Sequence, residues 1–262
     1  MLRLLRLPAH LQPRGKVAVC ALSGFRKARN MKKQIFAVSG KFFVNAWEEP
    51  KLQQHLLSLS EKPAPRISYV GAAVGDNPYE MEIFYRQMNQ HECRLTHLSL
   101  FEPHTADFES YFNEHDIVYV NGGATRNLVV LAREWGLDKA LRSAWENGVI
   151  LSGTSAGAIC WFESCITDSL PKKLLPQKCF GFLKGSASTH YDARPDRPEM
   201  FTRYLKEGSI VSPGYALDDH TAMHFIDTSL HEIVSAKAGA KARILIVKDG
   251  MIDEKFLAVR EL

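Results

Sequence analysis

From Gln34 onward, short β-branched segments alternate with segments of helical period, and this alternation limits the folds open to the chain. The composition of buried strands is found in IFAVSG (35–40), ISYVGAA (67–73), RLTHLSLF (94–101), IVYVNGG (117–123) and VILSG (149–153). Helical periodicity predicts helices over 46–59, 79–90, 107–113, 126–135 and 138–146, and a further helix after Ser155. The alternation predicts an α/β fold with a mostly parallel sheet covered on both faces.

After Leu170, Pro and Gly separate shorter segments. We expect strands or hairpins in CFGFL (179–183), SIVSPGYALDD (209–219), AMHFID (222–227), EIVSAK (232–237) and RILIVKDG (243–250), the last with Asp249-Gly250 as its turn. A helix is expected over 201–206. The chain has 262 residues, 45% of them apolar, so residues 31–262 are expected to bury one core as a single domain.

The basic residues are concentrated at the start of the chain. Residues 1–30 hold seven Lys or Arg and no acid, which leaves 26 basic against 29 acidic residues in the remainder. This leader has the character of an organelle targeting peptide, but it could equally be a disordered leader or sequence upstream of a start at Met31, and we favour these two alternatives. The remainder is slightly acidic, so its charge does not indicate a nucleic-acid-binding surface. No apolar run has the length of a membrane span. We therefore expect a cytoplasmic protein, or an organellar one if the leader is a transit peptide.

Five cysteines without an export signal indicate reduced thiols. Cys160 and Cys165 are five residues apart, and no second pair completes a zinc site. No glycine-rich phosphate loop follows the first predicted strand. We therefore expect neither a metal nor another cofactor.

The segment VILSGTSAGAICWF (149–162) runs from a strand through a Gly-x-Ser-x-Gly turn into apolar sequence. A sharp turn of this kind brings the strand and helix backbones together, so Gly153 and Gly157 are needed for their size. Ser155 would then stand at the carboxyl end of the sheet, beside the N–H groups that open the helix. Alternatively, Ser155 only caps the helix.

Two further features belong to the same chemistry. Gly122 and Gly123 end a predicted strand and would offer an unhindered N–H for an oxyanion hole, although a glycine pair also suits a plain turn. His190 lies in a loop of small and polar residues, GSASTHYDAR, and would activate the serine if a carboxylate fixed its tautomer. The acids between serine and histidine are Asp168 and Glu163, the second about two helical turns beyond Ser155.

The block NGGATRNLVVLAREWGLDKALRSAWENGVILSGTSAGAICWFE, with ASTHYD and GYALDD, resembles the peptidase E family of serine peptidases, family S51. That family includes aspartyl dipeptidases and, more distantly, cyanophycinase, and the likeness runs from about Met31 to the C-terminus. It implies a three-layer α/β sandwich related to class I glutamine amidotransferases, with serine in place of the elbow cysteine. Dimers would fit the family.

The resemblance also implies roles for individual residues. Ser155 matches the nucleophile and His190 the general base. Gly122 or Gly123, together with the N–H of Ala156, matches the oxyanion hole.

The third member of the triad and the substrate contact are implied less directly. Asp168 fits the acid of the dipeptidase branch, and Glu163 is the fallback, because relatives of the cyanophycinase type use a glutamate. Arg203, thirteen residues after His190, matches an arginine associated with recognising the substrate's aspartate side chain, but it could equally be a solvated helix residue.

The sequence departs from the family at two places. Many members carry a glycine run at the end of the first strand, where this chain has AVSGKFF, so Lys41 and Phe42 alter the neighbouring loop. His220 stands where relatives commonly have a small residue, and it could narrow the substrate pocket or join it. Asp218 and Asp219 could organise that loop.

The predicted reaction is amide hydrolysis of a short peptide through an acyl-enzyme, with an N-terminal Asp as the leading substrate. An esterase of the α/β-hydrolase type is one alternative, but its histidine normally lies far beyond the nucleophile, whereas His190 follows Ser155 by 35 residues. A non-catalytic relative that binds peptides or partners is the other.

Overall fold

The computed structural model describes residues 32–43, 50–171 and 173–262. Its central feature is a block of parallel strands: β1 (Gln34–Val38), β5 (Ile150–Thr154), β4 (Ile117–Val120), β2 (Arg66–Val70) and β3 (Arg94–Leu98), in that spatial order. Beyond β1, the sheet continues through the antiparallel strands β10 (Thr221–Ile226) and β11 (Ser229–Ser235) to β14 (Arg260–Glu261). The described residues thus form an eight-stranded, mostly parallel sheet, as the alternating sequence predicts.

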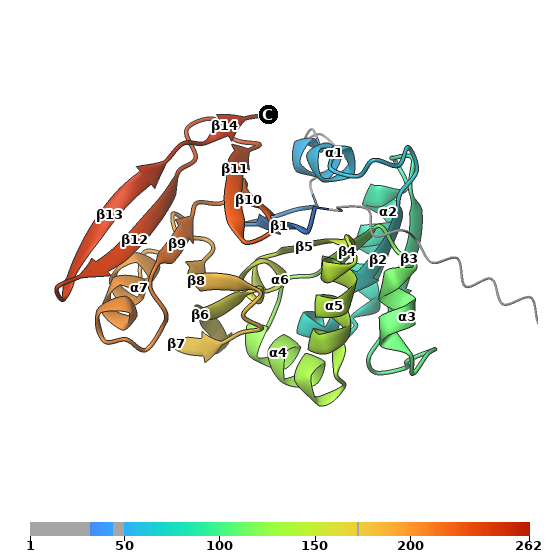
Figure 1. The fold of residues 1–262 in the computed structure, drawn as a ribbon, viewed down its shortest axis with the longest axis horizontal. Coiled ribbons are helices and arrows are strands. Elements are labelled where there is room, and N and C mark those ends of the chain that lie inside the picture. The colour runs from blue at the N-terminus through green and yellow to red at the C-terminus, as the bar shows by residue number, and fades with distance from the viewer. Residues whose placement is uncertain (1–31, 44–49, 172) are drawn as a thin grey trace, which may run out of the picture. The chain divides into compact units, whose positions relative to one another are not determined.

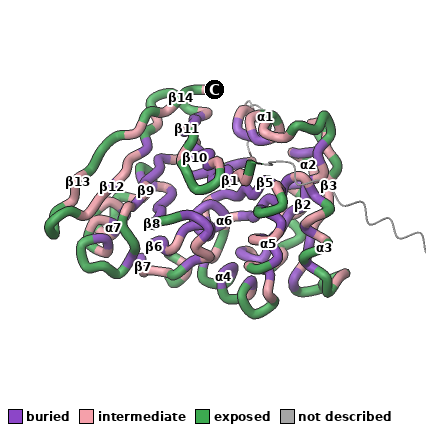
Figure 2. The backbone as a smooth tube through the Cα atoms, in the orientation of Figure 1, coloured by how far each residue is buried: buried purple, intermediate pink, exposed green. Residues whose placement is uncertain are grey.

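Helices cover both faces of this sheet (Figure 1). One face packs Phe36, Tyr69 and Tyr119 against α1 (Lys51–Ser58) and α2 (Pro78–Met88). The other packs the alternate residues of the same strands against α3 (Phe108–Asn113), α4 (Thr125–Glu134), α5 (Leu137–Glu146) and α6 (Ala156–Ile159). The strands are therefore buried on both sides, which explains their nearly continuous apolar composition (Figure 2).

A second sheet follows in the chain, and it completes the α/β sandwich expected from the resemblance. Its order is β13 (Met251–Leu257), β12 (Ala242–Lys248), β9 (Gly214–Leu217), β8 (Leu183–Ser188), β6 (Phe162–Leu170) and β7 (Lys173–Lys178). The helix α7 (Arg197–Lys206) packs Phe201 and Leu205 on this sheet. The turn between β12 and β13 is Asp249-Gly250, with φ values of 51° and 75°, so the predicted two-residue hairpin is confirmed.

The structure corrects two local predictions. The helix after Ser155 is a single turn that ends at Ile159, and the apolar sequence beyond it enters β6 instead. Because this segment is buried on all sides, its hydrophobicity does not distinguish helix from strand. CFGFL does not form one strand either, since Gly181 adopts a left-handed φ of 69° between β7 and β8.

Residues Met31–Leu262 form one compact unit. The leader predicted for residues 1–30 lies outside the described residues, as does the start of the helix predicted over 46–59. No helix among the residues that the structure describes is long and apolar enough to cross a membrane.

A buried histidine links β10 to its neighbours. The His224 side chain is 4% exposed, and its Nε2 lies 2.9 Å from the Gln34 Oε1. Its ring contacts those of Phe36 and His231, and Glu232 faces it at 3.9 Å. Burial, followed by the neighbouring His231, lowers the pKa of His224 from 6.5 to about 4, although Glu232 opposes the shift.

Acid should therefore destabilise the fold through His224. Between about pH 6.5 and 4, the unfolded chain binds a proton here that the folded chain excludes, so the free energy of unfolding falls as pH falls. The difference in pKa corresponds to at most about 3 kcal/mol. Urea unfolding at pH 6.5, 5.5 and 4.5 should show a flatter pH dependence in His224→Gln than in the wild type. The exposed His104→Gln is the control, and an unchanged slope in His224→Gln would contradict the prediction.

Candidate active site

Ser155 stands at the sharp turn between β5 and α6. Its φ of 52° and ψ of −110° are unusual for a residue with a side chain. The Ser155 N–H donates to the Val38 carbonyl at 3.0 Å, and the Ser155 carbonyl accepts from Ala158 and Ile159, each at 3.0 Å. Ser155 remains partly accessible although both sequence neighbours are buried, so the turn presents the hydroxyl as predicted.

Two glycines make this turn possible. A Cβ on Gly157 would overlap the Val120 carbonyl, and a Cβ on Gly153 would lie 2.6 Å from the same oxygen. The elbow therefore packs directly on the backbone at the end of β4. The requirement for small residues, inferred from the sequence, is confirmed at both positions.

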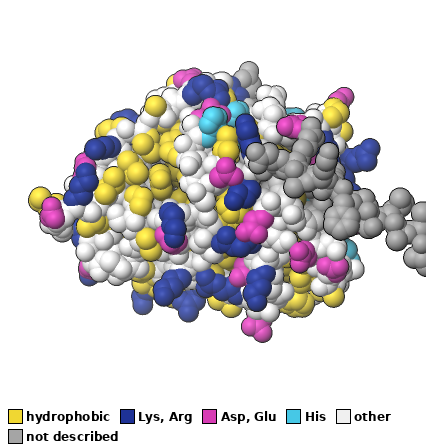
Figure 3. Space-filling model, in the orientation of Figure 1, with side chains coloured by type: hydrophobic (Ala, Val, Ile, Leu, Met, Phe, Trp, Pro, Cys, Tyr) yellow, Lys and Arg dark blue, Asp and Glu magenta, His cyan; other side chains and the backbone are white. Residues whose placement is uncertain are grey.

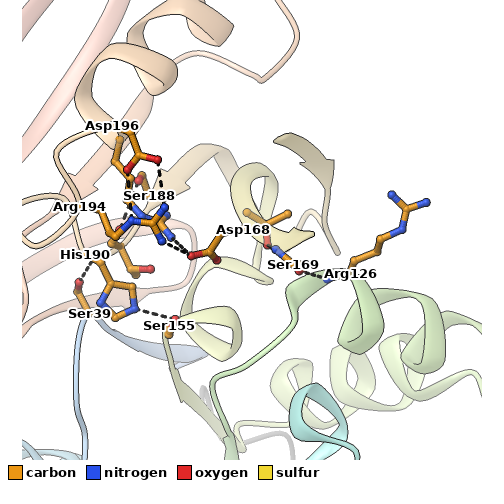
Figure 4. Close-up of polar contacts among 12 residues, drawn as sticks. Ser39, Arg126, Ser155, Asp168, Ser169, Ser188, His190, Arg194 and Asp196 are labelled. Atoms are coloured by element: carbon orange, nitrogen blue, oxygen red, sulfur yellow. Dashed lines mark hydrogen bonds and ion pairs between the residues drawn. The ribbon is translucent and has the colours of Figure 1, made fainter. Parts of the chain in front are cut away.

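His190 connects Ser155 to a carboxylate. Its Nε2 lies 2.8 Å from the Ser155 Oγ, and its Nδ1 lies 2.7 Å from the Asp219 Oδ1. The residue follows β8 and adopts a left-handed φ of 57°, and Figure 4 shows its ring directed at Ser155. Because an ionised carboxylate only accepts, Nδ1 carries the proton and Nε2 is left to accept from the serine hydroxyl. This is the geometry of a serine–histidine–aspartate triad.

The surroundings of Asp219 favour its ionised form. Burial acts to raise the pKa of this carboxyl, but the hydrogen bond and the charge of His190 outweigh it, with smaller contributions from His220 and Ser39, so the pKa is lowered. The Asp219 N–H also donates to the Asp192 carboxylate at 2.8 Å. The loops that carry His190 and Asp219 are thereby joined.

The structure places Asp168, the acid expected from the sequence, away from this role. Its carboxylate pairs with the Arg194 Nη1 at 2.7 Å and the Arg197 Nη2 at 3.3 Å (Figure 4). Asp168 lies on β6, and its side chain is 42% exposed. The carboxylate on His190 is instead that of Asp219, which follows the histidine in the chain.

The fallback acid, Glu163, serves the second sheet. It accepts from the Gly185 N–H at 2.8 Å and pairs with the Lys184 Nζ at 3.0 Å, which ties β6 to β8. It lies on a strand rather than two helical turns beyond Ser155, because α6 ends at Ile159.

Two of the three residues expected to form the oxyanion hole, Gly122 and Ala156, lie next to Ser155. Gly122 is close enough that a Cβ on it would be 3.2 Å from the Ser155 Cβ. Gly123 has a φ of 131° and packs on the Ala73 carbonyl, and Ala156 is the first residue of α6. Among the described residues, no backbone acceptor pairs with the N–H groups of Gly122, Gly123 and Ala156. Donors without a backbone acceptor are what an oxyanion hole requires.

Arg203 is not brought to Ser155 by any contact in the described part of the chain. Its side chain is 62% exposed and pairs with Glu207, one helical turn away on α7, at 2.7 Å. Arg194 lies closer to the site, since its N–H donates to the His190 carbonyl at 3.2 Å. Its guanidinium bridges Asp168 and Asp196 (Figure 4).

The residues at which the sequence departs from the family have different environments. Phe42 is buried, with its ring stacked on Tyr119 at 4.8 Å, whereas Lys41 is exposed. His220 adopts a left-handed φ of 66° directly after Asp219. Asp218 is buried and pairs with Arg243 at 2.8 Å, which anchors the same loop.

No cluster of three or more His, Cys, Asp or Glu residues that could hold a metal occurs within 32–43, 50–171 and 173–262. The four described cysteines are free thiols, and the Sγ atoms of Cys165 and Cys179 lie 3.5 Å apart in the interior.

The chain is similar to known peptidases. The model of peptidase family S51 matches residues 35–233. YgaJ of Bacillus subtilis (strain 168), an uncharacterized peptidase, is 43% identical over 230 residues, which are 88% of this chain and 99% of YgaJ.

Solved structures share the fold. A crystal structure of a peptidase from an acI-B1 Actinobacterium superposes with a TM-score of 0.65 at 16% identity, over 87% of this chain and 95% of that one. A candidate peptidase E from Listeria monocytogenes EGD-e superposes with a TM-score of 0.56 at 15% identity, over 76% and 97% of the two chains. At such identities, the likeness concerns the fold alone.

The geometry predicts which carboxylate activates Ser155. Asp219→Asn should slow covalent labelling of Ser155 by a fluorophosphonate by about 10³- to 10⁴-fold, because an amide can also donate and so no longer fixes the tautomer of His190 as a carboxylate does. Asp168→Asn is the matched control and should label within about threefold of the wild-type rate, since its partners are arginines. Intact-protein mass spectrometry over time gives the rate. A large loss in Asp168→Asn with none in Asp219→Asn would reverse the assignment.

Proposed function

Since the chain belongs to peptidase family S51, we propose that it is a serine peptidase that hydrolyses short peptides through an acyl-enzyme on Ser155. The observation that carries the proposal is the continuous path from the Ser155 hydroxyl through His190 to Asp219, with contacts of 2.8 and 2.7 Å. Every member of that path is in place, which favours an enzyme over a non-catalytic relative.

The reaction follows from this path. His190 Nε2 accepts the proton of Ser155 as its Oγ attacks the peptide carbonyl, and Asp219 stabilises the imidazolium that forms. The N–H groups near Gly122, Gly123 and Ala156 bind the oxyanion of the tetrahedral intermediate. His190 then returns the proton to the leaving amine, so the carbon–nitrogen bond breaks and an ester on Ser155 remains.

Hydrolysis of that ester repeats the sequence with water. His190 accepts a proton from the water as it attacks the acyl carbon, and then gives the proton to the Ser155 oxygen as the acid product leaves. Each step uses groups of this chain and water.

We further propose a preference for an N-terminal Asp, with Arg194 rather than Arg203 as the contact for its carboxylate. Arg203 is exposed and pairs with Glu207. Arg194 lies four residues after His190, and its backbone N–H donates to the His190 carbonyl. Asp168 and Asp196 hold the Arg194 guanidinium in a defined position, and its remaining N–H groups can donate to a further carboxylate.

A dipeptide panel tests the reaction. We expect hydrolysis of Asp-X dipeptides above Ala-X, Leu-X and Glu-X, and complete loss in Ser155→Ala, measured by release of the free amino acids. Turnover of nitrophenyl esters without any peptide would support an esterase. If no substrate is hydrolysed and a fluorophosphonate does not label Ser155, the result would support a non-catalytic binding protein.

A second comparison tests the specificity. Arg194→Ala should lower kcat/KM for Asp-X by about 10- to 100-fold relative to Ala-X, the size expected for one charged hydrogen bond. Arg203→Ala is the matched control and should leave this ratio unchanged. If Arg203→Ala lowers this ratio and Arg194→Ala leaves it unchanged, Arg203 rather than Arg194 contacts the substrate carboxylate.

A further inference from the structure

Ser39 lies directly after β1, at the point where both loops of the triad meet. It is fully buried, at 0% exposure. Its Oγ lies 3.0 Å from the His190 N, 3.2 Å from the Leu217 carbonyl and 3.4 Å from the Asp219 Oδ1. Figure 4 shows Ser39 beside His190, on the side of the ring away from Ser155. One hydroxyl therefore touches the base, its carboxylate partner and the strand that leads to that carboxylate.

The hydroxyl can satisfy these partners together. It accepts from the His190 N–H, and it holds one proton, which faces both the Leu217 carbonyl and the Asp219 carboxylate. Both acceptors belong to the same three-residue segment. The Ser39 hydroxyl thus restrains Asp219 in two ways, through the backbone carbonyl of Leu217 and through the Asp219 carboxylate itself.

The backbone around Ser39 adds to this restraint. The Ser39 N–H donates to the Thr221 carbonyl at 2.7 Å, and the Ser39 carbonyl accepts from the His220 N–H at 2.9 Å. A Cβ on Gly40 would lie 2.9 Å from the Asp219 Cβ and Cγ, so Asp219 packs directly on the glycine backbone. Asp219 is therefore held by the hydrogen bond from Ser39 and by direct packing on the backbone of Gly40.

We propose that Ser39 is a positioning residue for His190 and Asp219, an inference that rests on the proposed serine peptidase function. Loss of its hydroxyl would leave the partly buried His190 N–H without this acceptor and would remove one donor from Asp219. The imidazole would then be less well aligned with Ser155. Substrate binding does not depend on this contact.

The kinetic test compares Ser39→Ala with two other variants. Ser39→Ala should lower kcat for the best dipeptide by about tenfold with little change in KM, and Ser39→Thr, which keeps a hydroxyl, should restore most of the rate. The acid limb of the kcat/KM profile should move to higher pH in Ser39→Ala, because a carboxylate with one donor fewer holds the imidazolium proton more strongly. Ser152→Ala is the control, since Ser152 is equally buried and its Oγ donates to the Phe36 carbonyl at 2.9 Å.

Two outcomes would overturn the proposal. One is a wild-type rate and pH profile in a folded Ser39→Ala variant. The other is an equal loss in Ser39→Ala and Ser152→Ala without a shift of the acid limb, which would indicate a general effect of removing a buried hydroxyl. Circular dichroism and thermal unfolding establish that each variant is folded.

A spectroscopic measurement separates this proposal from the proposed function. The His190 Nδ1 proton that faces Asp219 should give a low-field proton NMR resonance, assigned by its absence in Asp219→Asn. Ser39→Ala should shift or broaden it, and Ser152→Ala should leave it in place. If the wild type hydrolyses no peptide but the resonance responds in this way, the function fails while the positioning role stands. An unmoved resonance in Ser39→Ala would refute the positioning role.

Discussion

The contact between two backbones at the end of β4 determines the geometry of the site. Gly153 and Gly157 let the elbow press on the Val120 carbonyl, and no residue with a Cβ would fit at either position without displacing the chain. Between these two glycines, Ser155 turns the chain with a φ of 52° and a ψ of −110°, and it stays partly accessible although Thr154 and Ala156 are buried. The sharp turn that presents the hydroxyl thus depends on a packing constraint, before any chemistry is considered.

The triad is assembled from both sheets. Ser155 follows β5 of the eight-stranded sheet, and His190 follows β8 of the six-stranded one. Asp219 lies where the chain crosses from β9 to β10, between the two sheets. The buried pair of Asp218 with Arg243 and the contacts of Ser39 hold this crossing from either side. On the molecular surface, Figure 3 shows where the charged and the apolar side chains of one face lie.

Much of this arrangement could be predicted from the sequence, because the alternation of strands and helices and the glycines around Ser155 express local requirements. The acid could not, since the order of the chain and the resemblance both favour Asp168, which lies between Ser155 and His190, whereas the fold brings Asp219 to the histidine from 29 residues downstream. The Asp-Asp of GYALDD is the available signal, but from the sequence it indicates only loop structure. The strand after Ile159 was missed because a fully buried segment carries no periodicity.

The position of Asp219 in the crossing between sheets has a consequence for when the chain becomes active. The nucleophile elbow is complete once β1, β4 and β5 have paired, but the base and its carboxylate are joined only after β8, β9 and β10 are in place. Under the proposed function, a chain in which these strands have not yet come together would therefore carry an unactivated serine. Hydrolysis would then begin only after strands of both sheets are in place.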